Sequence, residues 1–265
     1  MVLRRKKAHS AAEMRHVMTT IFWAGDSTVK TNSIVTYPQT GIGQAFYRYV
    51  RNMQVQIENH AENGRSTRSF MEEGRLAAIC DRMTAGDFLF IQFGHNDEKA
   101  EDAARYADAE VDYPANLERF VNAARSKGAT PVIITPLTRW NRHAGKYCHD
   151  AWAQSCRRTA QRLGVALIDL TRMSEELVDA IGDRARTDFY MNLPAGVYPG
   201  YPNGLQDGTH LQPLGAMTFA GLVAQGLYEL GGIYRELLCE GYEQWLSRDE
   251  ALVCRNQQEG ADERL

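Results

Sequence analysis

Five short apolar runs, separated by stretches with helical periodicity, constrain the fold of this chain more than any other feature. The runs cover residues 20–24, 55–57, 88–93, 131–135 and 165–170. Between them, apolar side chains recur at helical spacing, as in residues 70–80 and 117–124. Near-continuous apolar runs are typical of strands that helices cover on both faces. The alternation therefore predicts an α/β fold with a parallel sheet and right-handed helical crossovers.

Glycines mark the ends of two predicted helices. Gly128 and Gly164 each stand just before a predicted strand, where a glycine C-cap lets the chain reverse. Residues 184–209 are the one long segment without hydrophobic periodicity, and we expect a loop there that is either functional or disordered. From residue 255 on, the chain is polar and predicts a tail.

Length and composition predict one domain over residues 1–265, with its core over about 19–232. The net charge of -3 argues against a nucleic-acid partner, which needs a basic face, and the basic run 4–7 is interpreted as a tail. No stretch approaches the ~18 apolar residues that cross a bilayer. We expect a cytoplasmic protein, because the five cysteines form no CxxC pair and no apolar segment of a signal peptide follows the N-terminal charges. The sequence leaves open a leader removed from the native chain.

Polar motifs follow the predicted strands, at the edge where ligands bind in open α/β sheets. Gly-Asp-Ser-Thr (25–28) follows the first strand, residues 59–66 the second, and Gly-His-Asn-Asp (94–97) the third, while Asp-Gly-Thr-His (207–210) closes the long segment. Each motif alone is compatible with a turn or a helix cap. The four together, in this order, favour one functional site.

These motifs resemble the four sequence blocks of the SGNH (GDSL-like) hydrolases, over about residues 20–230. Segments 62–69, 92–97 and 198–204 make the chain most similar to the rhamnogalacturonan acetylesterase group of carbohydrate esterases. The resemblance implies a three-layer α/β/α sandwich with a five-stranded parallel sheet, the flavodoxin-like SGNH hydrolase fold.

The resemblance implies that Ser27 is the nucleophile of a serine esterase. A serine hydroxyl needs a base to take its proton, and His210 is the candidate. Asp207, three residues earlier, can orient the imidazole if the two residues form a turn that enters a helix. Asp26 is interpreted as a turn residue that supports the Ser27 loop rather than as the catalytic acid.

The resemblance assigns the oxyanion hole to the backbone N–H groups of Ser27 and Gly64 and the side-chain amide of Asn96. A chain turn after a strand leaves N–H groups free, and glycine allows a ligand to approach closely. This chemistry needs no cofactor, and no His/Asp/Glu set has the spacing of a zinc site, so we predict no metal.

Five further residues are candidates for substrate contact, each with a structural alternative. They are His95, Arg65, Trp140, Tyr198 and Tyr201. His95 is equally compatible with a structural hydrogen bond, and Arg65, like Arg68, with a solvated surface. The aromatic rings suit sugar stacking or packing of the long segment.

The sequence therefore predicts a carbohydrate O-acetylesterase that works through an acetyl-enzyme intermediate. The resemblance suggests pectic rhamnogalacturonan first, then xylan or mannan oligosaccharides, and a cytoplasmic location favours imported fragments. The alternatives are a lipid-type esterase or thioesterase on the same fold, and a carbohydrate-binding homologue without catalysis. The sequence fixes neither the acetylated hydroxyl nor the oligomeric state, with a homodimer among the options.

Overall fold

The computed structural model describes residues 18–51, 53–140 and 149–242. The basic run 4–7 and the polar tail from residue 255 lie outside the described residues. The strands are β1 (Thr19–Gly25), β2 (Val55–Asn59), β3 (Phe88–Gln92), β4 (Thr130–Ile134), β5 (Ala166–Ile168), β6 (Tyr190–Leu193) and β7 (Leu205–Leu211). The α-helices are α1 (Ile42–Ala45), α2 (Thr67–Glu72), α3 (Arg75–Arg82), α4 (Asp112–Ser126), α5 (Asp150–Leu163), α6 (Leu170–Ile181), α7 (Arg184–Asp188), α8 (Pro213–Leu230) and α9 (Gly232–Arg235). Two 3-10 turns, η1 (Ile34–Thr36) and η2 (Phe46–Tyr49), complete the set.

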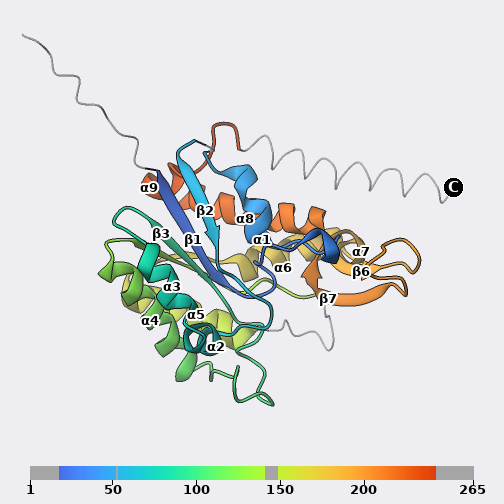
Figure 1. Cartoon of the computed structure of the whole chain (residues 1–265), viewed down its shortest axis with the longest axis horizontal. Coiled ribbons are helices and arrows are strands. Elements are labelled where there is room, and N and C mark those ends of the chain that lie inside the picture. Colours follow the sequence, from blue (N-terminus) through green and yellow to red (C-terminus); the bar gives the residue numbers. More distant parts are fainter. Residues whose placement is uncertain (1–17, 52, 141–148, 243–265) are drawn as a thin grey trace, which may run out of the picture.

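A five-stranded parallel sheet in the order β2-β1-β3-β4-β5 forms the centre of the molecule (Figure 1). β1 lies between β2 and β3, so Trp23 pairs with Asn59 on one side and with Phe90 on the other. Helices α2 to α5 cover one face, and α1, α6 and α8 cover the other. The predicted α/β/α sandwich is confirmed.

Two hydrophobic cores lie on the two faces of the sheet. On one side Trp23 packs edge-on against Phe90, with ring centroids 5.3 Å apart. On the other side Phe93 packs against Phe120 at 5.4 Å. Both faces of β1 and β3 are buried, which is why their sequences are almost continuously apolar. The carboxyl ends of these strands are therefore held on a rigid support.

The predicted strand over residues 165–170 is too long. β5 ends at Ile168, because the side chain of Asp169 caps α6 by accepting a hydrogen bond from the Arg172 N–H at 3.4 Å. The predicted glycine ends of the helices are present. Gly164, at the end of α5, has φ 58°, and Gly128 after α4 has φ 72°.

The expectation of a loop without secondary structure over residues 184–209 is wrong. This segment contains α7 and the antiparallel pair β6–β7, a second small sheet. The turn between the two strands ends at Gly204, whose φ of 71° and close approach to the Leu193 carbonyl require a residue without a Cβ. β7 carries Asp207 and His210 to the edge of the main sheet. Among the described helices, none is long and apolar enough to cross a membrane.

Candidate active site

Ser27 lies in a tight turn directly after β1. The carboxylate of Asp26 accepts hydrogen bonds from the Thr28 N–H at 2.9 Å and from Thr28 Oγ1 at 2.7 Å. The Asp26 carbonyl also accepts from the N–H groups of Val29 and Lys30, both at 3.1 Å. Asp26 therefore stabilises the turn that carries Ser27, as the sequence predicts. It is not the residue that orients His210.

His210 joins Ser27 to Asp207. Its Nε2 lies 2.9 Å from Ser27 Oγ, and its Nδ1 lies 2.6 Å from Asp207 Oδ2. The other carboxylate oxygen of Asp207 accepts from the N–H groups of Thr209 at 2.7 Å and His210 at 3.1 Å. The two residues lie in strand β7 rather than in a turn that enters a helix, so that expectation is wrong. The hydrogen bonds of the Asp207 carboxylate to the N–H groups of Thr209 and His210 still bring the Asp207 and His210 side chains into contact.

The Asp207 carboxylate stays ionised in this setting. Burial acts to raise its pKa, but the hydrogen bond and charge of His210, with the two backbone N–H groups, lower the pKa to about 2. An ionised carboxylate on Nδ1 leaves Nε2 of a neutral imidazole able to accept the Ser27 proton.

Three hydrogen-bond donors face the space beside Ser27. In the part of the chain that the structure describes, the backbone N–H groups of Ser27 and Gly64 have no hydrogen-bond partner. Gly64 has φ 74°, a left-handed conformation that favours glycine. Asn96 donates one amide N–H to the Arg65 carbonyl at 3.1 Å, and Arg105 donates to its Oδ1 at 3.5 Å. These contacts fix the orientation of the amide, and its second N–H has no hydrogen-bond partner among the described residues.

Ser27 opens into a cleft of about 380 Å³. Its described lining consists of Ser27, Gln39, Asn63, Gly64, His95, Asn96, Lys99, Arg105, Arg139, Asp207, Thr209 and His210. No aliphatic or aromatic hydrocarbon side chain occurs in this lining. The cleft is therefore suited to a polar ligand.

Of the five residues predicted to contact substrate, only His95 belongs to the described lining of the cleft. Arg65 instead pairs with Glu73 at 2.9 Å. Trp140 donates its backbone N–H to the Gly208 carbonyl at 2.7 Å. The Tyr201 hydroxyl donates to the Thr36 carbonyl at 3.3 Å, and the Tyr198 ring packs on Tyr37 at 6.0 Å. For these four, substrate contact stays a prediction that the lining of the cleft does not support.

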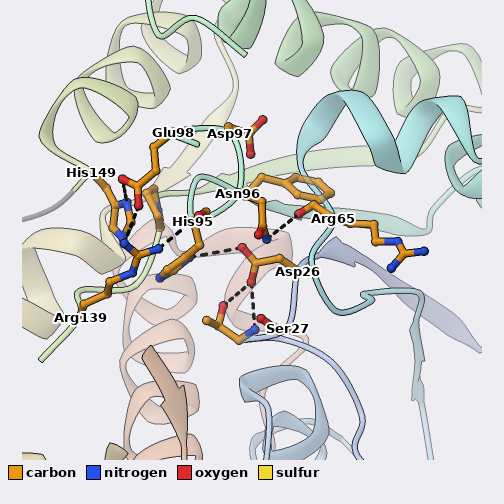
Figure 2. A network of polar contacts seen from close by, with 12 residues as sticks. Asp26, Ser27, Arg65, His95, Asn96, Asp97, Glu98, Arg139 and His149 are labelled. Carbon is orange, nitrogen blue, oxygen red and sulfur yellow. Dashed lines mark hydrogen bonds and ion pairs between the residues drawn. The ribbon is translucent and has the colours of Figure 1, made fainter. Parts of the chain in front are cut away.

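A polar network that sequence reasoning missed lies behind the nucleophile (Figure 2). His95 Nδ1 contacts Asp26, and the His95 carbonyl accepts from Arg139 at 3.2 Å. Glu98 binds Arg139 at 2.5 Å and His149 Nδ1 at 2.6 Å. Glu98 follows the Gly-His-Asn-Asp motif directly, which is the one sequence signal for its place. The side chain of His149 is fully buried. In the described ranges, no group of three His, Cys, Asp or Glu residues is placed to hold a metal ion.

Known proteins with similar sequences cover the same segments. The family model for GDSL-like Lipase/Acylhydrolase matches residues 21–223. Rhamnogalacturonan acetylesterase RhgT of Bacillus subtilis (strain 168) is 38% identical over 214 residues, which are 80% of this chain and 90% of RhgT. Probable rhamnogalacturonan acetylesterase YesY of the same strain is 36% identical over 213 residues, 80% of this chain and 93% of YesY. The crystal structure of protein YxiM of B. subtilis is 26% identical, with a TM-score of 0.68 over 81% of this chain and 57% of that one.

The matched residues include every motif on which the resemblance to the SGNH hydrolases rests, and that resemblance is confirmed. The chain is a carboxylic ester hydrolase, and it belongs to the GDSL-like lipase/acylhydrolase family.

Proposed function

We propose that this esterase removes O-acetyl groups from acetylated carbohydrates, with fragments of pectic rhamnogalacturonan as its first substrate. The observation that carries the proposal is the Ser27–His210–Asp207 chain of hydrogen bonds, 2.9 and 2.6 Å long, beside a polar cleft. The names of RhgT and YesY, which share 36–38% identity with this chain, support the substrate class.

In the proposed mechanism, Ser27 Oγ attacks the acetyl carbonyl while His210 Nε2 takes its proton. The N–H groups of Ser27 and Gly64 and the Asn96 amide donate to the oxyanion of the tetrahedral intermediate. His210 then returns the proton to the departing sugar oxygen, which leaves an acetyl-enzyme. A water molecule activated by His210 releases acetate and restores Ser27.

A lipid-type esterase or thioesterase is the main alternative. An acyl chain needs a groove lined by Leu, Ile or Phe, and the described lining of this cleft contains none of them. A binding homologue without catalysis is disfavoured because the whole hydrogen-bonded set is in place. The cleft therefore favours a short acyl group on a polar carrier.

Acetate release tests the proposal. Wild-type protein and the Ser27→Ala variant are incubated with acetylated rhamnogalacturonan, xylan and mannan oligosaccharides, and with p-nitrophenyl acetate and octanoate. We expect acetate from the rhamnogalacturonan fragments at the highest kcat/KM, and none from the variant. Inactivity of the wild type on every acetyl ester, or a strong preference for octanoate, contradicts the proposal.

We further propose that the enzyme works in the cytoplasm on imported oligosaccharides. Cys80, Cys156 and Cys239 are free thiols, which suits a reducing compartment. Fractionation of cells that express the native gene tests this location, and activity recovered only outside the cytoplasm contradicts it.

A further inference from the structure

Three cationic side chains line the cleft beyond Asn96. They are Lys99, Arg105 and Arg139. The described lining contains one carboxylate, that of Asp207, and it is hydrogen-bonded to His210. The chain as a whole carries a net charge of -3, so this cleft is a local exception. A cleft lined by one sign of charge concentrates ligands of the opposite sign.

Two of the three cations are already paired. Arg139 binds Glu98 at 2.5 Å, and Arg105 binds Asp102 at 2.5 Å. Lys99 is partly buried, and its ammonium group has no hydrogen bond or ion pair to any residue that the structure describes. Burial lowers the pKa of Lys99, and the charges of Arg105 and Arg139 lower it further. The charges of Glu101 and Glu98 act in the opposite direction, but neither carboxylate forms an ion pair with Lys99 in the part of the chain that the structure describes. Three positive charges therefore lie along this wall of the cleft, and among the described residues the Lys99 ammonium has no carboxylate partner.

The free cation is held close to the proposed oxyanion hole. A series of turns follows β3, in which the Lys99 N–H donates to the Asn96 carbonyl at 3.3 Å and the Lys99 carbonyl accepts from the Asp102 N–H at 2.9 Å. Arg105, at the end of the same turns, reaches Asn96 Oδ1 at 3.5 Å. An anionic group beside Lys99 would thus belong to the same bound molecule as the ester at Ser27.

We propose that Lys99, with Arg105 beside it, forms a subsite for the carboxylate of a uronic acid residue in an acidic, acetylated oligosaccharide. The proposal rests on the proposed function, because it assigns the charge of that carbohydrate. The ammonium of Lys99 and the unused guanidinium N–H groups of Arg105 are charge-assisted donors to a carboxylate. Arg65, a predicted substrate contact, and its neighbour Arg68 are both engaged elsewhere. Arg65 binds Glu73, and Arg68 binds Asp112 and the Ala103 carbonyl.

Calorimetric binding to Ser27→Ala protein tests the subsite without turnover. The probes are trigalacturonate and its fully methyl-esterified form, which has the same sugars without the charge. We expect trigalacturonate to bind about tenfold more tightly at low salt, and Lys99→Gln to remove most of this preference. Lys127→Gln is the matched control, because Lys127 follows α4 and is not part of the described lining, and it should keep the preference. Equal binding of the two probes, no binding of trigalacturonate, or a preference that survives Lys99→Gln overturns the proposal.

Kinetic measurements distinguish a failure of the proposed subsite from a failure of the proposed function. A wild type that releases acetate from carbohydrates while its Ser27→Ala form binds both probes equally keeps the function and overturns the subsite. A wild type that is inert on all acetyl esters, with charge-selective binding that depends on Lys99, keeps the subsite and overturns the function.

Discussion

His95 Nδ1 lies 3.3 Å from Asp26 Oδ2, directly behind the turn that carries Ser27 (Figure 2). Both side chains are almost completely buried. Burial acts to raise the pKa of Asp26, but the nearby His95 and the hydrogen bonds from Thr28 lower that pKa below its ordinary value. His95 is therefore a positioning residue for the Ser27 turn, whether or not it also touches substrate.

Removal of this partner should destabilise the protein. His95→Ala leaves the buried Asp26 carboxylate without its imidazole neighbour, and we expect the free energy of unfolding to fall by about 1–3 kcal/mol. In the Asp26→Asn background the same change should cost much less, because no buried charge remains. Urea denaturation of the four proteins measures the coupling, and additive losses would contradict it. His60→Ala is a control, since His60 contacts Glu58 at 3.5 Å outside the cleft and should cost less than about 1 kcal/mol.

Asn96 offers a test of the proposed oxyanion hole. Asn96→Ala removes one neutral donor, and we expect kcat on p-nitrophenyl acetate to fall by about 10²–10³ with little change in KM. Asn116→Ala is the matched control, because that buried amide donates to Thr67 Oγ1 at 3.0 Å and is not part of the described cleft lining. It should lower stability but keep kcat. Near wild-type turnover in folded Asn96→Ala protein would remove Asn96 from the site.

The layers of the fold could be predicted because burial on both faces of a strand leaves a continuous apolar run, as in Phe88–Gln92. β7 could not, because its residues are mostly half-buried and polar and carry neither a continuous nor an alternating apolar pattern. The contact between Asp207 and His210 could be predicted from the sequence because His210 follows Asp207 by only three positions. The strand that carries them was not.

The residues predicted to contact substrate were harder to identify from the sequence, because contacts between distant segments decide which charged side chains form ion pairs. Arg65 and Lys99 are both basic residues close to a motif. The structure gives Arg65 the carboxylate of Glu73 and leaves Lys99 without one. Similarly, Tyr201 is bound to the carbonyl of Thr36, 165 residues away. No local pattern carries this information.

The hydrogen bond from His210 Nδ1 to Asp207 predicts a tautomer effect. Asp207→Asn puts an amide where the carboxylate accepts the Nδ1 proton, so it favours the imidazole form that cannot take the Ser27 proton. We expect kcat to fall by about 10⁴ while KM and the melting temperature change little. Steady-state kinetics and a thermal melt check this. A loss that follows the loss of folded protein would indicate a structural role instead.

Asp97 predicts a pH dependence of stability. Its carboxylate is fully buried and accepts from the Thr67 N–H at 2.9 Å and Oγ1 at 2.5 Å, while its Oδ2 has no hydrogen-bond partner in the described part of the chain. Burial raises its pKa to about 7, which the Thr67 hydrogen bonds only partly offset, and the nearby charge of Asp26 adds to the rise.

Because the folded-state pKa lies above the ordinary value of 3.8, the stability that Asp97 contributes is complete below about pH 4 and is lost as the pH rises through 7. The wild type should therefore lose about 2–4 kcal/mol of unfolding free energy relative to Asp97→Asn between pH 5 and pH 8. Urea denaturation at four pH values across this range measures the difference. Asp169→Asn is the control, because the hydrogen bonds and charge of Arg157 outweigh burial and lower the pKa of Asp169, so its effect should be constant over the same range. A pH-independent difference for Asp97→Asn would show that this carboxylate is ionised in the folded protein throughout.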